Sequence, residues 1–363
     1  GGRIAEIIGP RECISLSLLV CGMLLCLAPW AAYISPYALA AIQLTLGLCE
    51  GPVFPAIYSL LSRWASQKQK ATTFILATSG TAIGCIGSMA GSGIVIEVLG
   101  WHWVFWGGGL LSFALLPAWL LFVRNSPDDH PLMSDHEKNI LEANCHVIRP
   151  RNAPWGRLLR CWRLHAVIFT EFVFCWITNL CFMEAPTFLS NKIGFGLLEA
   201  SWVLGIAQAV KLVAGIIVGW ASDFIAKKEI LSQVNSRRLF HILATVCVCI
   251  CLLMLSQVGC ASTEAATLMV LLTASLTLGS GSYVLAPFDM APNYSGTIGG
   301  LIGFGNLGGF LGPIIIAPLL EHENGWSWSF MIGFILFLIQ GVVYTFTVSD
   351  KVQDWNYYIE IGN

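Results

Sequence analysis

The sequence carries little charge, and that scarcity excludes a water-soluble domain. Only 11% of its 363 residues are Asp, Glu, Lys or Arg, whereas 56% are hydrophobic, and the mean hydropathy is +0.72. A soluble globular domain carries about a quarter charged residues. The net charge of −2 also gives no basis for binding nucleic acid. The composition therefore indicates a protein that lives in a lipid bilayer.

Three kinds of motif are missing, and each absence argues against a class of function. None of the 13 cysteines forms a Cys-x-x-Cys pair, and the run CVCIC at 247–251 has no metal spacing. Free cysteines in apolar runs behave as small hydrophobic residues, so we expect no metal site and no cofactor. The lack of a Walker-type loop argues against a nucleotide-driven pump. The lack of a His-Glu-x-x-His or similar paired constellation argues against a membrane-embedded enzyme.

Long apolar runs are what the sequence does contain. About 20 apolar residues cross a bilayer as a helix, and ten such runs follow one another along the chain. They predict an all-α, multi-pass membrane protein. The expected spans are 13–34, 37–62, 71–97, 102–123, 164–189, 199–222, 239–259, 265–288, 295–319 and 326–348.

The basic residues alternate between the two sides of this arrangement. All but two of the 19 Lys and Arg residues fall on one side, and the exceptions are Lys192 and Lys211. The Lys/Arg-rich side of a membrane protein faces the cytoplasm. The segments assigned to that side are 1–12, 63–70, 124–163, 223–238 and 349–363.

A short repeat divides the chain into two halves. GGRIAEIIGPRE and VGWASDFIAKKE share a glycine, an acid four residues later and a base a few residues on. Duplicated halves are a common transporter design, with the site near the midplane between them. We expect an N-terminal half at 1–124, a cytoplasmic loop at 125–163, a C-terminal half at 164–348 and a tail at 349–363. The repeat residues, expected to form a gate, are Gly2, Glu6, Arg11, Gly219, Asp223 and Lys227.

Both repeats resemble the cytoplasmic loop motif of the major facilitator superfamily. A closer resemblance is to its anion:cation symporter branch, which includes sialin, vesicular glutamate and nucleotide transporters and type I phosphate transporters. It rests on six motifs in order: GLCEGPVFPA, PTFLSNKIGF, ILSQVNSRRL, DMAPNYSG, GNLGGFLGP and VQDW. The resemblance implies two six-helix halves, with the ten spans here numbered three to twelve. On that reading the chain lacks the first span and most of the second.

Glu50 is the one charge in the run from Tyr37 to Leu61. A carboxylate at this depth is costly, so we expect it to face the bundle interior and to bind and release a proton. The alternative is a structural carboxylate tied to a neighbouring helix. Gly47 and Gly51 would allow close helix contact there.

Gln43 lies two helical turns before Glu50, on the same face. The resemblance implies an arginine here that pairs a substrate carboxylate, and a second one at the position of Phe174. Glutamine can donate hydrogen bonds but cannot supply the bidentate, charged pairing of a guanidinium.

Lys211 shares a helical stripe of small and polar residues with Gln208. It could bind an anionic substrate, or it could pair with Glu50 or Glu171 and be structural. Glu171 could instead be a second protonation site. The resemblance implies that Trp176 and Asn179 line a central cavity. Tyr283 could bind a polar substrate, or its hydroxyl could bond a neighbouring helix.

Two further expectations concern the ends of spans. Asp289, like Asp223, is expected to cap a helix and pair with an arginine of the loops. Asn293 begins a glycosylation sequon that the topology places in the cytoplasm, so we expect it to be unused.

The leading hypothesis is a secondary transporter that moves a small organic anion or related polar metabolite with H⁺ or Na⁺ by alternating access. Such a chain would act as a monomer in a lysosomal, vesicular or plasma membrane, with no nucleic-acid partner. The alternative is a non-transporting relative that acts as a sensor or scaffold, which the missing arginines would suit.

Overall fold

The computed structural model describes residues 1–65, 70–127, 130–131, 133–134, 153–258, 262–349 and 351–357. All regular structure in these residues is helical, and ten helical segments are long and apolar enough to cross a membrane. The predicted all-α membrane fold is confirmed. The ten segments are Pro10–Ile34, Pro36–Trp64, Ala71–Ser88, His102–Phe122, Trp162–Lys192, Trp202–Lys227, Gln233–Gln257, Thr263–Met290, Pro292–Leu319 and Gly325–Thr347.

In the N-terminal half, the first residues of two helices follow from the sequence. Proline at the first helical position is pre-organised for a helix, and Pro10 and Pro36 both begin one. The Ser35 hydroxyl caps the helix that begins at Pro36, because it accepts a hydrogen bond from Ala38 N. The run expected at 37–62 is divided at Gly51–Pro52. The helices are α1 (Gly2–Ile8), α2 (Pro10–Ile34), α3 (Pro36–Glu50), α4 (Val53–Trp64), α5 (Lys70–Leu99) and α6 (His102–Phe122).

The C-terminal half contains three spans that are not continuous α-helix. Two π-helical turns, η2 and η3, flank Pro186, and short 3₁₀ turns interrupt two later spans. Such breaks are tolerated in membranes where neighbouring groups satisfy the freed backbone. The elements are α9 (Trp162–Asn179), η2 (Leu180–Glu184), α10 (Ala185–Thr187), η3 (Phe188–Lys192), α11 (Leu197–Lys227), α12 (Gln233–Gln257), α13 (Ser262–Leu276), η4 (Thr277–Gly281), η5 (Tyr283–Leu285), α14 (Ala286–Met290), η6 (Pro292–Tyr294), α15 (Ser295–Ile302), η7 (Gly303–Asn306), α16 (Leu307–Leu319) and α17 (Gly325–Thr347).

Two short elements lie outside the bundles at the Lys/Arg-rich end. The loop expected at 125–163 lies largely outside the described residues, but its last part contains α8 (Trp155–Leu158). The expected tail contains η8 (Asp354–Tyr357). Gln353 N donates to Met290 O at 2.9 Å, which ties the tail to the end of α14.

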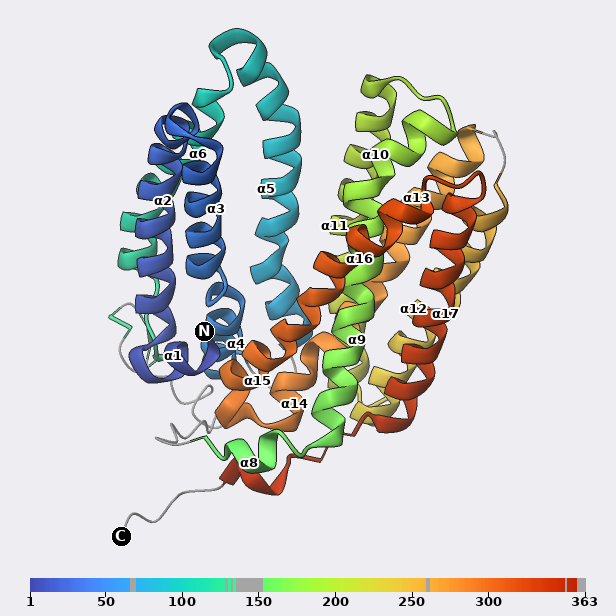
Figure 1. Cartoon of the computed structure of the whole chain (residues 1–363). Helices are drawn as coiled ribbons and strands as arrows, with labels where there is room; N and C mark the ends of the chain where they lie inside the picture. The colour runs from blue at the N-terminus through green and yellow to red at the C-terminus, as the bar shows by residue number, and fades with distance from the viewer. Residues whose placement is uncertain are drawn as a thin grey trace.

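The two halves meet at this same end. The ribbons converge around α1, α4, α14 and α15 and diverge towards the opposite end (Figure 1). A buried aromatic cluster joins the halves. Tyr58 is stacked on Phe74 at 4.9 Å, and its ring is tilted against Phe288 at 5.4 Å between ring centroids. Aromatic contacts of this kind add to the area they bury. The structure is therefore closed at the Lys/Arg-rich end.

Candidate functional site

The first repeat crosses from the N-terminal half to the C-terminal half. Glu6 on α1 accepts from Thr297 N and from Thr297 Oγ1, both at 2.6 Å, and pairs with Arg3 at 2.9 Å. Thr297 lies in the first turn of α15, where unpaired N–H groups favour a carboxylate. A Cβ on Gly2 would lie 1.8 Å from Gly296 O, so only glycine fits this contact.

The second repeat makes the reciprocal contact. Asp223 on α11 accepts from Ala71 N at 3.1 Å and from Thr72 N at 2.7 Å, in the first turn of α5. Gly219 packs against the same turn of α5. Each half therefore caps a helix of the other half with its motif acid.

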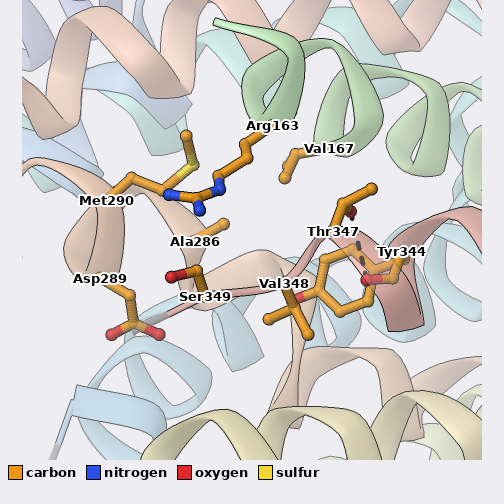
Figure 2. Close-up of a pocket in the computed structure, with 9 residues that line it drawn as sticks. All are labelled: Arg163, Val167, Ala286, Asp289, Met290, Tyr344, Thr347, Val348 and Ser349. Carbon is orange, nitrogen blue, oxygen red and sulfur yellow. Dashed lines mark hydrogen bonds between the residues drawn. The ribbon is translucent and has the colours of Figure 1, made fainter. Parts of the chain in front are cut away.

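The bases of the two repeats do not cross between the halves. Arg11 Nη2 donates to Leu120 O at 2.7 Å within its own half, and Lys227 is exposed at the end of α11. The base that acts beside the second repeat is Arg237, whose Nε lies 2.9 Å from Asp289 Oδ2 in a buried ion pair. Asp289 thus pairs with an arginine of segment 223–238, as expected. The pair lies beside a small pocket at the ends of α9, α14 and α17, which Arg163 also lines (Figure 2).

Glu171 occupies the place where the broken spans of the C-terminal half meet. Its half-buried carboxylate accepts from Cys175 Sγ at 3.4 Å and interacts with the Tyr283 phenol of η5. Cys175 Sγ also reaches Asn306 Oδ1 of η7 at 3.1 Å. A Cβ on Gly305 would lie 2.5 Å from Glu171 Cβ, so η7 approaches α9 closely.

Tyr58 brings the N-terminal half to this cluster. It lies on α4 and interacts electrostatically with both Glu171 and Tyr283. Tyr58 thus couples the N-terminal half electrostatically to the Glu171 cluster. Sequence reasoning missed Tyr58, because a tyrosine in an apolar run is more often packing than chemistry.

Trp176 and Asn179 lie on the same helix as Glu171 and face α16. Trp176 is 3% exposed and packs against Gly312. Its Nε1 has no hydrogen-bond partner in the described part of the chain. Asn179 Nδ2 donates to Cys175 O at 3.1 Å, and the same amide lies against Gly309.

Lys211 lies between the halves. It interacts electrostatically with Cys85 of α5 and with Cys175 and Cys181 of the α9 span. Among the described residues no ion pair joins it to Glu50 or Glu171. Gln208, one turn earlier on α11, is 4% exposed. The described residues therefore do not show the ion pair that a structural role of Lys211 would use.

Gln43 and Glu50 lie apart from this cluster. Both are exposed, and Leu46 is the one buried residue of α3 among those described. Nothing lies within 4 Å of a Cβ placed on Gly47, so the expected close helix contact is absent in the described chain. Glu50 is exposed on the open flank of α3, and it interacts electrostatically with the Cys21 thiol of α2. Its proton-binding role stays a prediction.

Phe174 lies in the core of the C-terminal half. It is 5% exposed, and its ring packs at 4.5 Å from the Tyr283 ring and 4.8 Å from the Phe337 ring. The position expected to hold an arginine is thus filled by aromatic packing next to the Glu171 cluster.

Comparisons with known proteins agree with this geometry. The family model of the Major Facilitator Superfamily matches residues 1–313. Human sialin is 24% identical over 363 residues, covering 98% of this chain and 73% of sialin. Human vesicular glutamate transporter 2 is 24% identical with 98% of this chain and 62% of its own length covered. Mouse sodium-dependent phosphate transport protein 1 is also 24% identical, with 98% of this chain and 77% of its own covered.

Two solved symporters share the fold. A variant of the E. coli fucose:proton symporter superposes with a TM-score of 0.70 at 11% identity, over 96% of this chain and 86% of the symporter. The proton:xylose symporter XylE gives 0.69 at 14%, over 94% and 81%. The chain therefore belongs to the major facilitator superfamily, a family of multi-pass membrane transporters and not of enzymes.

Proposed function

We propose that this protein is a secondary active transporter that couples proton movement to a small organic anion or related polar metabolite by alternating access. The observation that carries the proposal is the Glu171 cluster. An acid of α9 there interacts electrostatically with phenols from both halves, at the breaks of two further spans. Broken helices at a repeat interface are where transporters of this design place substrate and ion.

The reciprocal caps supply the moving part of the mechanism. Each cap binds across the halves at one end of the molecule, so the state described here is closed at that end and corresponds to an outward-facing arrangement. Opening this end requires Glu6 and Asp223 to leave the helix ends that they cap. Substrate and proton binding at the centre would have to offset that loss.

The substrate assignment draws on the relatives and on Lys211. Relatives of this chain include sialin and transporters that are named for glutamate and for phosphate, both of which are anions. Lys211 is the one lysine or arginine in the middle of a predicted span, and it interacts electrostatically with Cys175, whose thiol donates to Glu171. We propose that Lys211 binds the anionic group of the substrate. Gln43, Gln208, Trp176 and Asn179 are assigned hydrogen bonds or packing to the substrate. Glu50 is assigned to proton binding, or to Na⁺ if the coupling ion is sodium.

Uptake into liposomes tests this proposal. The purified protein would be reconstituted, and accumulation of a panel of labelled organic anions and phosphate measured under imposed H⁺ or Na⁺ gradients. We expect gradient-driven accumulation that Glu171→Gln abolishes and that Glu321→Gln, an exposed acid between α16 and α17, leaves unchanged. Lys211→Gln should raise KM more than it lowers kcat.

A sensor or scaffold is the second candidate, and the loss of both expected arginines favours it. Gln43 is exposed and Phe174 is packed in the core, so neither can bind a carboxylate as a guanidinium does. The same assay separates the two candidates. A folded protein that accumulates no solute under any gradient would support the sensor and rule out the transporter. Membrane placement in a lysosome, vesicle or plasma membrane and a monomeric state belong to the same proposal.

A further inference from the structure

A buried polar cluster lies beside the Glu171 site without being part of it. His241 on α12 is 0% exposed. Its Nδ1 lies 3.2 Å from Ser282 Oγ, and its Nε2 lies 3.1 Å from Gln340 Oε1 on α17. Ser282 is the residue between η4 and η5, where the span 263–290 is broken. The imidazole therefore connects two continuous helices to the break in a third.

Both neighbours of the imidazole are placed as hydrogen-bond acceptors. Gln340 presents its carbonyl oxygen, and Ser282 donates its own hydroxyl proton to Gly279 O at 3.0 Å. A neutral imidazole has one N–H and can donate to only one of these oxygens, whereas an imidazolium donates to both. The site can satisfy either protonation state, because the Ser282 hydroxyl can change its partner.

Loss of the proton requires the Ser282 hydroxyl to turn. The neutral ring keeps its bond to Gln340, and its bare Nδ1 must then accept the Ser282 proton. Gly279 O then loses its hydrogen bond from Ser282. Gly279 lies in the 3₁₀ turn η4, which Arg237 Nη1 also binds by donating to Gly281 O at 3.2 Å. The hydrogen bonding of the backbone at the break therefore depends on the charge of His241. Tyr283, the next residue, interacts with Glu171.

The charged and titratable groups around His241 come from several elements. Arg237 lies one turn earlier on α12, and its charge is offset by Asp289 of α14. Tyr344 of α17 lies against the imidazole with ring centroids 4.1 Å apart, and Tyr283 of η5 follows Ser282. The α9 side contributes the uncharged ring of Phe174 at 6.2 Å. No carboxylate among the described residues bonds the imidazole directly, so a proton there adds a net positive charge.

The small pocket at the Lys/Arg-rich end supplies a route to this ring. Tyr344 lines that pocket together with Arg163 and Asp289 (Figure 2). Because Tyr344 also lies against His241, this one side chain connects the imidazole to the pocket.

We propose that His241 is a second proton-binding residue of the transport cycle, which exchanges its proton through the pocket at the Lys/Arg-rich end and acts on the broken span through Ser282. The proposal rests on the proposed transporter function. The proton comes from water at that end and returns to water, so no further reactant is needed. Glu171 and His241 then act on neighbouring residues of one turn, Tyr283 and Ser282.

Two transport modes in liposomes test this role. The first is proton-driven accumulation, and the second is exchange of the same labelled solute without any gradient. His241→Gln keeps a donor and an acceptor but cannot bind a proton. We expect exchange within about twofold of wild type and accumulation reduced by about tenfold or more, because only the coupled mode needs the proton. His165→Gln, at an exposed position of α9, is the matched control and should change neither mode.

A second variant keeps the imidazole. Gln340→Leu removes one acceptor of the imidazolium, which disfavours the charged ring. The pH at which accumulation is half-maximal should therefore move about one unit to the acid side, as expected for loss of one charge-assisted hydrogen bond. Folding of each variant is checked by gel filtration in detergent. If His241→Gln does not fold, the Gln340→Leu profile decides alone.

The outcomes separate this proposal from the proposed function. Unchanged accumulation in His241→Gln overturns the role of His241 while the transporter stands. Equal loss of exchange and accumulation, with no shift in the Gln340→Leu profile, makes His241 a structural residue and also overturns it. Absence of any gradient-driven accumulation by wild type overturns the proposed function itself.

Discussion

The two reciprocal caps use the same motif with different partners. Glu6 binds one backbone N–H and one hydroxyl of Thr297, and it also pairs with Arg3. Asp223 binds two backbone N–H groups, those of Ala71 and Thr72. A hydroxyl can turn to suit a new neighbour, whereas a backbone N–H cannot. The cap on α5 therefore tolerates less change in the capping side chain than the cap on α15 does.

The groups beneath the caps differ as well. In the C-terminal half the buried base is on α12 and the acid on α14, as Arg237 and Asp289. In the N-terminal half the order is reversed: the acid Glu12 is on α2 and the base Arg63 on α4, with Asn125 bonded to both. The acid and the base therefore lie on exchanged helices in the two halves, and in the C-terminal half they form a direct ion pair.

The largest expected effect comes from breaking the buried ion pair. Arg237→Met leaves Asp289 buried without its cation, which costs about 3–5 kcal/mol of stability. Arg63→Met is the matched change in the other half, and it should cost less because it leaves Asn125 O and Ser59 Oγ, which are uncharged, without their donor. Thermal unfolding in detergent measures both. Equal losses of stability would contradict the proposed difference between the halves.

Next in size is the steric test of the two glycines. Gly2→Ala places a Cβ 1.8 Å from Gly296 O, which is backbone and cannot move aside. Gly219→Ala meets the tip of Ile75 at 2.7 Å, and a flexible methyl can move. We expect Gly2→Ala to separate the halves at the Lys/Arg-rich end and Gly219→Ala to be tolerated. Spin labels at the exposed positions Ile8 and Asn235 report the separation. A larger change in Gly219→Ala would be evidence against this packing.

A smaller difference is expected between the two motif acids. Asp223→Asn turns an N–H₂ group towards a fixed backbone N–H, whereas Glu6→Gln faces a hydroxyl that can rotate to accept. Loss of a charged hydrogen bond costs about 1.5–3 kcal/mol, and the Asp223 variant should lie at the upper end. The same pair of labels should therefore show more of the open population in Asp223→Asn. The reverse order would show that the Arg3 pair, and not the hydroxyl, decides the strength of the cap.

The smallest expected effect is none at all. Asn293 is buried, and its side chain donates to Asn356 O at 3.0 Å in the tail. A glycan cannot be attached to a side chain in that place. Asn293→Gln should leave the gel mobility of protein made in mammalian cells unchanged. A mobility shift in the variant would overturn the predicted sidedness.

The sequence was sufficient for the architecture because hydrophobic length and charge alternation act over whole spans. It was also sufficient for Glu6 and Asp223, whose repeat is visible as a spacing. It was not sufficient for Tyr58 or His241, because their roles depend on partners far away in the chain. Glu50 is a different case: the sequence predicted a carboxylate that faces the bundle interior, and the structure places it exposed on the open flank of α3, so its role stays a prediction.

Alternating access is tested most directly by measuring both ends of the molecule together. One label pair at Ile8 and Asn235 reports the Lys/Arg-rich end, and a second at Val98 and Asn191 reports the opposite end; all four residues are exposed. On acidification with a transported solute, the first distance should lengthen while the second shortens, and Glu171→Gln should abolish the change. If both distances stay constant in wild type while solute accumulates, the two halves do not rock about the Glu171 cluster.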